Sequence, residues 1–266
     1  MSDFSPIPSD VDPERRFGGL ERLYGEGTLA RLAAARVAVI GIGGVGCWVA
    51  EALVRSGVGM LKLIDPDNLA ESNINRQIHA LDDTLGQAKV TAMAARIRSI
   101  HPQCLIETVE DFLTSENTAS LLHGVGLVVD AIDDARAKAA IAAHCRQARL
   151  PLLMAGGAGG KTDPRRIRVE DLAHTTQDPL LSKVRARLRR EYGFTREPGK
   201  KFGIEAVTSN EPPQRPPACG AGPHALSCAG YGSSMAMTAS IGLFIAARAI
   251  ERLLEGSGTP KAQRKE

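Results

Sequence analysis

Short apolar runs alternate with longer amphipathic stretches over the first 155 residues. Runs of four or five apolar residues are typical of strands that are buried on both faces, and the stretches between them carry apolar residues at helical spacing. The predicted strands are 37–40, 60–64, 104–108, 127–130 and 151–155, and the predicted helices are 45–56, 85–99, 115–123 and 134–148. Strands that alternate with helices indicate an α/β fold with a doubly wound, mostly parallel sheet.

The alternation becomes irregular beyond residue 156. A strand at 167–169, a basic helix near 180–191 and a strand around 203–208 predict a C-terminal extension on the substrate side of the sheet. The amphipathic run 235–254 predicts a closing helix. We therefore expect a single domain over 16–255, with a core at 16–160 and a substrate-side region at 161–255. Residues 1–15 lack the features of a signal peptide and are expected to form a mobile tail, and 256–266 a second tail.

Closely spaced glycines separate the first predicted strand from the helix that follows it: Gly41, Gly43, Gly44 and Gly46. Glycine lets a backbone turn tightly and approach phosphate oxygens, and a helix N-terminus offers free N–H groups and partial positive charge to an anion. A strand, a glycine loop and a helix in this order predict a Rossmann-like nucleotide-binding core. Taken alone, the loop fits an NAD- or FAD-binding domain equally well.

A second motif favours a nucleoside triphosphate. Asp65 ends the next strand about 20 residues after the glycines, where a carboxylate holds ribose hydroxyls. Asn73, Arg76 and Gln77 follow, and the next helix carries Lys89. Cleavage between the α and β phosphates places charge on the departing pyrophosphate, which Arg76 and Lys89 can balance. The diphosphate of NAD is not cleaved and has no such need, so the motif favours a nucleoside triphosphate over NAD.

Three carboxylates follow the strand predicted at 127–130: Asp130, Asp133 and Asp134. Ligands of open α/β sheets bind beyond the carboxyl ends of the strands, so we expect Asp65, Asp130 and Asp133 to face one crevice. A carboxylate beside a triphosphate suits Mg²⁺, and Asp133 is the predicted metal ligand. Asp134 is better explained as a helix N-cap, and the role of Asp130 is left open.

Together these residues resemble the ubiquitin-activating-enzyme superfamily, whose small bacterial members adenylate carboxylates with Mg·ATP. The resemblance implies a homodimer in which an arginine of the partner subunit reaches the ATP, with Arg16 or Arg22 as candidates. It also implies nucleotide-binding and catalytic roles for the residues of the two motifs and for Asp133. These are the glycine loop at Gly41, Gly43, Gly44 and Gly46, ribose-binding Asp65, then Asn73, Arg76 and Lys89. Gln77 is expected beside them as a neutral donor to the same oxygens.

The cysteines separate branches of that superfamily. The molybdopterin- and thiamine-pathway members carry two Cys-x-x-Cys pairs for zinc, whereas the five cysteines here (47, 104, 145, 219 and 228) form none, so structural zinc is not expected. Segments 16–25, 75–80, 156–161 and 176–180 instead look like the tRNA threonylcarbamoyladenosine dehydratases, over roughly 16–254. The chain departs from them at the Pro-rich stretch 211–227. Cys228 is the one plausible thiol reactant, although packing is the simpler role for a lone cysteine.

The branch resemblance implies a mechanism. ATP adenylates the threonyl carboxylate of threonylcarbamoyladenosine next to the anticodon of tRNA, and the carbamoyl group then closes a ring with loss of one water. The second step is intramolecular, so positioning supplies much of its rate and no protein nucleophile is needed. Two alternatives remain: an adenylyltransferase that activates the C-terminus of a ubiquitin-like sulfur-carrier protein, and, more distantly, a nicotinamide oxidoreductase. A sulfur-relay partner is possible.

The charge and hydropathy of the chain indicate its partners and its location in the cell. The net charge is only +3, but 183–201 holds eight Lys or Arg against two Glu, which makes the segment from Lys183 to Lys201 a candidate tRNA contact. Residues 225–247 carry no charge, yet their serines and glycines favour a buried helix or a dimer interface over a membrane span. Scattered cysteines suit a cytoplasmic protein. Cys47 and Trp48 are expected to pack in the core, and His79 and His101 to lie at the surface or at helix ends.

Overall fold

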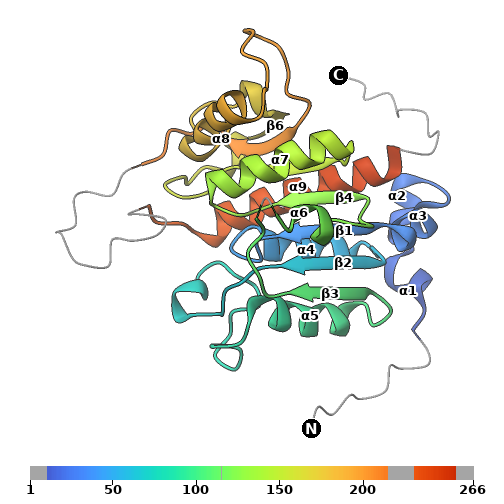
Figure 1. Cartoon of the computed structure of the whole chain (residues 1–266). Helices are drawn as coiled ribbons and strands as arrows, with labels where there is room; N and C mark the ends of the chain where they lie inside the picture. The colour runs from blue at the N-terminus through green and yellow to red at the C-terminus, as the bar shows by residue number, and fades with distance from the viewer. Residues whose placement is uncertain (1–10, 115, 215–230, 256–266) are drawn as a thin grey trace.

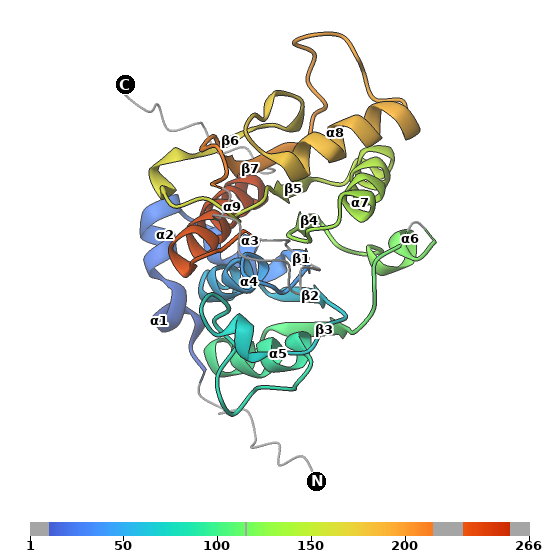
Figure 2. The same ribbon diagram turned by 90° about the vertical axis from the view of Figure 1, so that its left-hand side faces the viewer.

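The computed structural model describes residues 11–114, 116–214 and 231–255, which form a sheet between two layers of helices (Figures 1 and 2). Within these ranges the sheet has seven strands in the order β3-β2-β1-β4-β5-β7-β6. Six strands run parallel, and β6 pairs antiparallel with β7 at one edge. The strands are Arg36–Ile40 (β1), Met60–Ile64 (β2), Leu105–Val109 (β3), Leu127–Asp130 (β4), Leu152–Ala155 (β5), Ile167–Asp171 (β6) and Glu205–Ser209 (β7).

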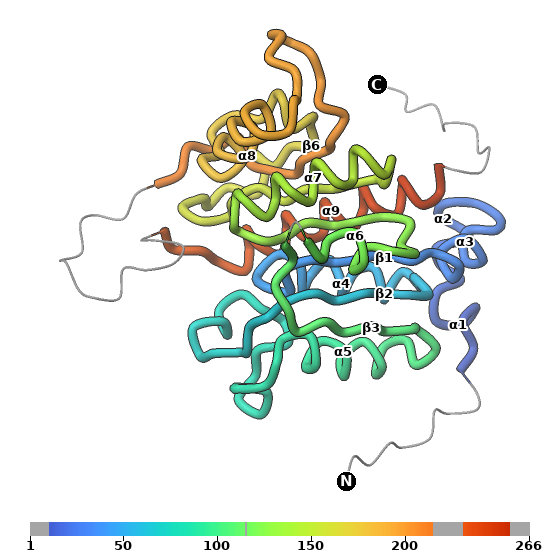
Figure 3. The backbone as a smooth tube through the Cα atoms, viewed as in Figure 1, coloured from blue at the N-terminus to red at the C-terminus, as the bar shows by residue number. Residues whose placement is uncertain are grey.

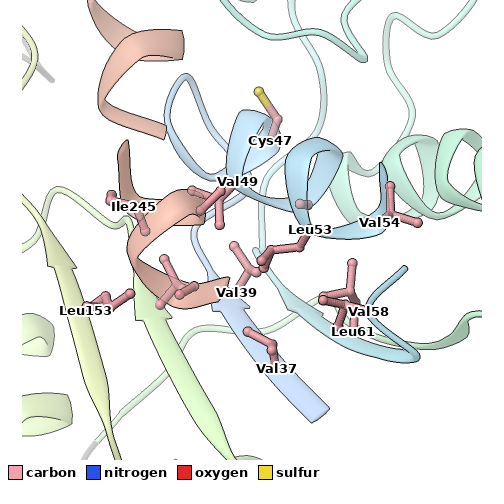
Figure 4. Packing of buried hydrophobic residues seen from close by; sticks show 14 of the residues in the cluster. Val37, Val39, Cys47, Val49, Leu53, Val54, Val58, Leu61, Leu153 and Ile245 are labelled. Carbon is pink, nitrogen blue, oxygen red and sulfur yellow. The ribbon is translucent and has the colours of Figure 1, made fainter. Parts of the chain in front are cut away.

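The central strands are buried on both faces, as their unbroken apolar sequences require. On one face, alternate residues such as Val37, Val39 and Leu61 pack with three helices: α4 (Gly46–Arg55), α5 (Lys89–Ile100) and α9 (Met235–Glu255). Figure 4 shows this cluster, with Val49 and Leu53 of α4 and Ile245 of α9 above the strands. On the other face, Ala38 and Ile40 pack with α7 (Ala135–Ala148) and α8 (Pro179–Glu191).

The remaining helices are short. Near the amino ends of the strands lie α1 (Pro13–Phe17), α2 (Gly19–Tyr24) and α3 (Thr28–Ala34), and α6 (Thr118–Leu121) precedes β4. Three 3₁₀ turns occur at Glu71–Asn73, Pro164–Arg166 and Leu172–His174. None of the described helices combines the length and apolarity that a membrane crossing demands, α9 included.

The mostly parallel α/β sheet predicted from the sequence is confirmed, and the predicted strands match the observed ones within one or two residues. β6 and β7, predicted as part of an extension, continue the same sheet beyond β5. The helix predicted at 85–99 begins only at Lys89, because the residues before it form turns and Ala88 makes a bridge to Asn68. The helix predicted at 115–123 is reduced to a single turn.

The expected tail at 1–15 is wrong at its inner end. Asp12 accepts hydrogen bonds from the backbone N–H groups of Glu14 and Arg15 and so caps α1, which already begins at Pro13. Residues 1–10 and 256–266 lie outside the described ranges. α1, α2 and α3 were not predicted, since five to seven residues are too few to show a helical period.

Candidate functional site

The glycine loop lies where the strand order reverses, between β1 and β4. Gly41 directly follows β1, and its φ of +84° is a conformation that favours glycine. A Cβ at this position would lie 2.9 Å from the backbone of Ala131 and Ile132, just after β4. The loop therefore touches the turn that carries Asp133. In an open α/β sheet this reversal point is where ligands bind.

Asp65, at the end of β2, joins the glycine loop to the neighbouring strand. Its carboxylate accepts hydrogen bonds from the backbone N–H of Ile42 (2.6 Å) and of Asp67 (2.9 Å). The ammonium of Lys89 lies 3.6 Å from Asp65 and 2.7 Å from Asp67. Burial raises the pKa of Asp65, and the positive charge of Lys89 opposes that shift. Asp65 and Lys89 thus lie together beside the glycine loop.

Arg76 reaches across the same loop. Its Cδ lies 3.2 Å from the place that a Cβ on Gly44 would occupy. Its guanidinium donates to the carbonyl of Ser72 (2.6 Å) and to Oδ1 of Asn75 (2.8 Å), while its own carbonyl accepts from the indole N–H of Trp48 (2.9 Å). Trp48 was expected in the core. It is partly buried and packs against the core cluster, as expected, and its indole N–H also holds the backbone of Arg76 in place.

Asn73 and Gln77 occupy the turn on either side of Arg76. Asn73 accepts a hydrogen bond from the backbone N–H of Ala70 and closes the 3₁₀ turn Glu71–Asn73. Gln77 is buried, and its Oε1 has no hydrogen-bond partner among the described residues. The structure therefore brings Arg76 and Gln77 of the second motif beside the glycine loop, at the carboxyl ends of β1 and β2.

Asp133 is exposed in the turn between β4 and α7, one residue before the helix cap. The expected N-cap role of Asp134 is confirmed, since its carboxylate accepts from the backbone N–H of Ala137 at 2.6 Å. In the described part of the chain no three His, Cys, Asp or Glu side chains gather as a metal site. Magnesium commonly uses one or two carboxylates together with substrate phosphates, so a single exposed carboxylate such as that of Asp133 fits this ion.

Asp130 does not share the crevice with Asp65 and Asp133, contrary to expectation. It is fully buried, and Lys138 of α7, also fully buried, donates to its carboxylate at 2.9 Å and to its carbonyl at 3.2 Å. The same carboxylate oxygen accepts from the backbone N–H of Ile132. Burial raises the pKa of Asp130 and the Lys138 charge opposes the shift. The pair thus fixes the turn that contacts Gly41.

We predict that Lys138→Met lowers the free energy of unfolding by about 3–5 kcal/mol, because it leaves a buried carboxylate without its counter-charge. The double variant Asp130→Asn/Lys138→Met, which removes both charges and keeps an acceptor for Ile132, should recover most of the loss. Urea unfolding measures the stability, and titration with ATP measures whether the turn still supports binding.

The matched control is Lys62→Met, which removes a partly buried lysine paired with Glu107 at 2.9 Å, away from the glycine loop. It should leave ATP affinity unchanged. Equal losses of ATP affinity in Lys138→Met and Lys62→Met would show that the buried pair has no special connection to the loop.

His79, expected at the surface or a helix end, is only 2% exposed. Neither ring nitrogen has a hydrogen-bond partner among the described residues. Burial, with smaller contributions from the charges of Lys89 and Arg96, lowers the pKa of His79 to about 4. The imidazole of His79 is therefore neutral near pH 7.

His101 is also buried, although it does lie at a helix end, as the C-cap of α5.

Because the folded pKa of His79 lies below the usual value of 6.5, the unfolded state binds more protons between pH 6.5 and 4. The contribution of His79 to stability is thus present above pH 6.5 and lost as the pH falls towards 4, by up to about 3 kcal/mol. We predict that His79→Leu flattens this part of the stability profile, measured by urea unfolding. His123→Gln, at an exposed histidine, is the control and should leave the slope intact.

The glycine-rich segment 156–161 lies at the carboxyl ends of β5 and β7. Asp178, the buried N-cap of α8, accepts from the backbone N–H of Gly157 (2.9 Å) and from the hydroxyl of Thr208 (2.5 Å). Lys161 is 3% exposed and donates to the carbonyl of Ser209 at 2.8 Å. These contacts join the start of α8 to the carboxyl ends of both strands.

The same segment holds the chain on both sides of residues 215–230, which lie outside the described ranges. The backbone N–H of Gln214 donates to the carbonyl of Gly160 at 2.7 Å, and the N–H of Gly160 donates to the carbonyl of Gly232 at 2.8 Å. The amide of Asn75 donates to the carbonyl of Ser233 at 3.1 Å. The approach to α9 is therefore tied to the motif that carries Arg76.

Of the cysteines, Cys47, Cys104 and Cys145 are buried thiols. Burial raises their pKa to about 12, 11 and 12, so they are poor nucleophiles at neutral pH. Cys219 and Cys228 fall within 215–230, outside the described residues. The packing expected for Cys47 agrees with its burial.

Two groups of predicted residues lie apart from the glycine loop. Arg16 of α1 donates to the carbonyl of Ile100, at the C-terminal end of α5, and Arg22 lies on α2. Both helices lie near the amino ends of the strands, so neither arginine lies beside the loop of its own subunit (Figure 1). The segment from Lys183 to Lys201 forms most of α8 and the loop that follows it.

Comparison with known proteins matches this chain over most of its length. The model of the ThiF family matches residues 19–265. The chain is 45% identical to the tRNA threonylcarbamoyladenosine dehydratase of Haemophilus influenzae, over 91% of this chain and 94% of that protein. It is similar to the structure of the Escherichia coli tRNA N6-threonylcarbamoyladenosine dehydratase in complex with ATP, with a TM-score of 0.84, 44% identity, and coverage of 91% of this chain and 95% of that one. The molybdopterin-synthase adenylyltransferase of Salmonella typhimurium is 37% identical over only 45% of this chain and 48% of that protein.

Proposed function

This chain belongs to the ThiF family, and we propose that it uses ATP to dehydrate threonylcarbamoyladenosine in tRNA, closing a ring beside the anticodon. The observation that carries the proposal is the 45% identity to a dehydratase over nine-tenths of both chains. A crevice at the reversal of strand order, with a glycine loop and two nearby cations, supports the ATP-dependent chemistry.

The first step makes the acid reactive. A carboxylate is a poor electrophile because resonance spreads its charge. Attack of the threonyl carboxylate on the α-phosphate forms an acyl adenylate and releases pyrophosphate. In this proposal the glycine loop cradles the phosphates, and Asp65 holds the ribose. Arg76 and Lys89 balance the charge that develops on the pyrophosphate, while Asn73 and Gln77 supply neutral donors.

The second step needs no nucleophile from the protein. A nitrogen or oxygen of the carbamoyl group attacks the activated carbonyl, and the C–O bond to AMP breaks. The attacking group loses its proton, so the net change across both steps is the loss of one water with ATP converted to AMP and pyrophosphate. Because the attack is intramolecular, the walls of the crevice act by positioning. The wall built from Asp178, Lys161 and Thr208 is suited to that purpose.

Asp133 is the proposed ligand for Mg²⁺, which when bound neutralises phosphate charge. Structural zinc forms no part of the proposal. The supporting observations are the exposure of Asp133 and the closeness of Gly41 to Ala131 and Ile132, which precede Asp133 in the same turn.

The decisive test uses purified protein, tRNA that carries threonylcarbamoyladenosine, and Mg·ATP, followed by mass spectrometry of the nucleosides. We expect a nucleoside lighter by one water that forms only with ATP. Asp133→Asn should slow its formation by about 100-fold or more and raise the Mg²⁺ concentration required. The neighbouring Asp134→Asn is the matched control and should stay within about twofold, since Asn caps helices as well as Asp does.

Two results would contradict this assignment. Unchanged tRNA nucleosides after incubation with ATP would refute the dehydratase activity. Equal losses in the Asp133→Asn and Asp134→Asn variants would remove Asp133 from the metal site and leave the activity itself standing.

A homodimer is the proposed assembly, with Arg16 or Arg22 of one subunit reaching the nucleotide of the other. Their place near the amino ends of the strands excludes them from their own loop and suits a role in the partner. Exposed apolar side chains on α2 and α9, namely Leu23, Leu243 and Phe244, offer surface for such an assembly. We place the protein in the cytoplasm, where tRNA is modified, without a membrane partner.

The second candidate is an adenylyltransferase that activates a ubiquitin-like sulfur carrier, with a sulfur-relay partner. It is favoured only by the partial match to molybdopterin-synthase adenylyltransferase. The two candidates differ at Cys228, which the ring closure does not need. We predict that Cys228→Ser keeps the dehydration rate within about twofold, because positioning alone drives the second step. Cys219→Ser is the control, and a selective loss with Cys228→Ser would favour thiol chemistry.

A further inference from the structure

Two adjoining hollows open at the edge of the sheet opposite the glycine loop. One, of about 430 Å³, lies at the amino ends of β4, β5 and β7, and the other, of about 570 Å³, lies under the loop 193–203. They share Arg146 and Phe202, so we treat them as one feature, the amino-edge hollow. The loop over it projects beyond α8 in Figures 1 and 3.

The amino-edge hollow carries positive charge that the described residues do not neutralise. Its two carboxylates are already occupied: Glu205 pairs with Arg248 and Arg252, and Glu197 with Lys200. The other cations of its lining have no acidic partner among the described residues: Arg146, Arg149, Arg196 and Lys201. An anion that enters the hollow therefore meets cations whose charge is still available.

Aromatic rings hold part of this charge in place. Phe194 and Phe202 are buried and meet edge to face, with ring centroids 5.0 Å apart. The guanidinium of Arg146 lies 4.2 Å from the centroid of Phe194, and that of Arg189 lies 5.1 Å from the centroid of Phe202. A guanidinium stacked on a ring keeps its N–H groups at its edge, where they can donate to phosphate oxygens.

Most cations of α8, by contrast, are engaged within the protein. Arg187 and Arg190 both pair with Glu191, and Arg185 donates to the hydroxyl of Thr175. Arg185 and Arg189 bond there to neutral oxygens, so α8 keeps part of its positive charge. The loop after the helix extends that charge, and Arg146 and Arg149 join it from the end of α7.

We propose that the amino-edge hollow binds backbone phosphates of the tRNA, at a site separate from the ATP crevice. This inference rests on the proposed function. α8 begins at the carboxyl edge, where Asp178 contacts Gly157, and its 13 residues run for about 20 Å to the amino edge. An RNA whose modified nucleotide enters the crevice can continue along α8 to the hollow. Arginine and lysine side chains suit contacts to phosphates. Such contacts position an RNA but do not read its sequence.

The test compares Arg196→Glu and Lys201→Glu with Arg98→Glu, which reverses an exposed cation of α5 beside the other edge of the sheet. Binding of full-length tRNA is measured over a range of salt concentrations. Each hollow variant should raise the Kd by about tenfold and make the salt dependence shallower by about one phosphate contact. In the dehydration assay KM for tRNA should rise while kcat at saturating tRNA and the affinity for ATP stay unchanged.

Three results would overturn the proposal. Losses no larger than that of Arg98→Glu would show a general charge effect, and a lower kcat with unchanged KM would place these residues in the chemistry. Binding of inorganic pyrophosphate that the variants abolish, with tRNA affinity intact, would assign the hollow to a small phosphate ligand. Failure of the proposed function is distinguishable, because wild-type protein would then form no dehydrated nucleoside whatever its tRNA affinity.

Discussion

The structure of the crevice depends on one close contact between two backbones. Gly41 leaves β1 in a conformation with positive φ and passes so near to Ala131 and Ile132 that a Cβ would lie 2.9 Å from their atoms. β1 and β4 are neighbours in the sheet, and the strand order reverses between them. The helices that follow these strands consequently depart to opposite faces, with α4 on one side and α7 on the other. The N-termini of both helices offer backbone N–H groups and partial positive charge beside this point, which favours an anion there.

Such a contact needs support on both sides, and the protein supplies it differently on each. On the β2 side, Asp65 accepts the N–H of Ile42 and lies near Lys89, so the loop is held by a carboxylate that also faces the nucleotide side. On the β4 side, Asp130 and Lys138 are fully buried and hold the turn from below. The first pair can respond to a ligand, whereas the second is shielded from one. Charged groups with similar chemistry thus hold the two sides of the same contact.

The parts of this arrangement that sequence could predict are local. A glycine loop between a strand and a helix is a pattern of a few consecutive residues, and so is an N-cap such as Asp134. The buried pair escaped prediction because only the packing of α7 against β4 brings Lys138 to Asp130, and the sequence does not show which way α7 faces. The hydrogen bond of Trp48 escaped because its partner is the carbonyl of Arg76, and a backbone group leaves no mark in the sequence. The short helices before β1 lack the length that would reveal a period.

The two edges of the sheet differ in the partial charge that the helix ends place there. Parallel strands place every βα turn, and so every helix N-terminus, at the carboxyl edge. That edge suits an anion that must be held closely and cleaved. The amino edge receives the C-terminal ends of α7 and α8, whose partial negative charge favours cations such as Arg146, Arg149 and Arg190. The helix N-termini at the carboxyl edge and the cations at the amino edge belong to different ends of the same helices. An ATP site and a separate phosphate-binding surface can therefore occur in one small α/β protein.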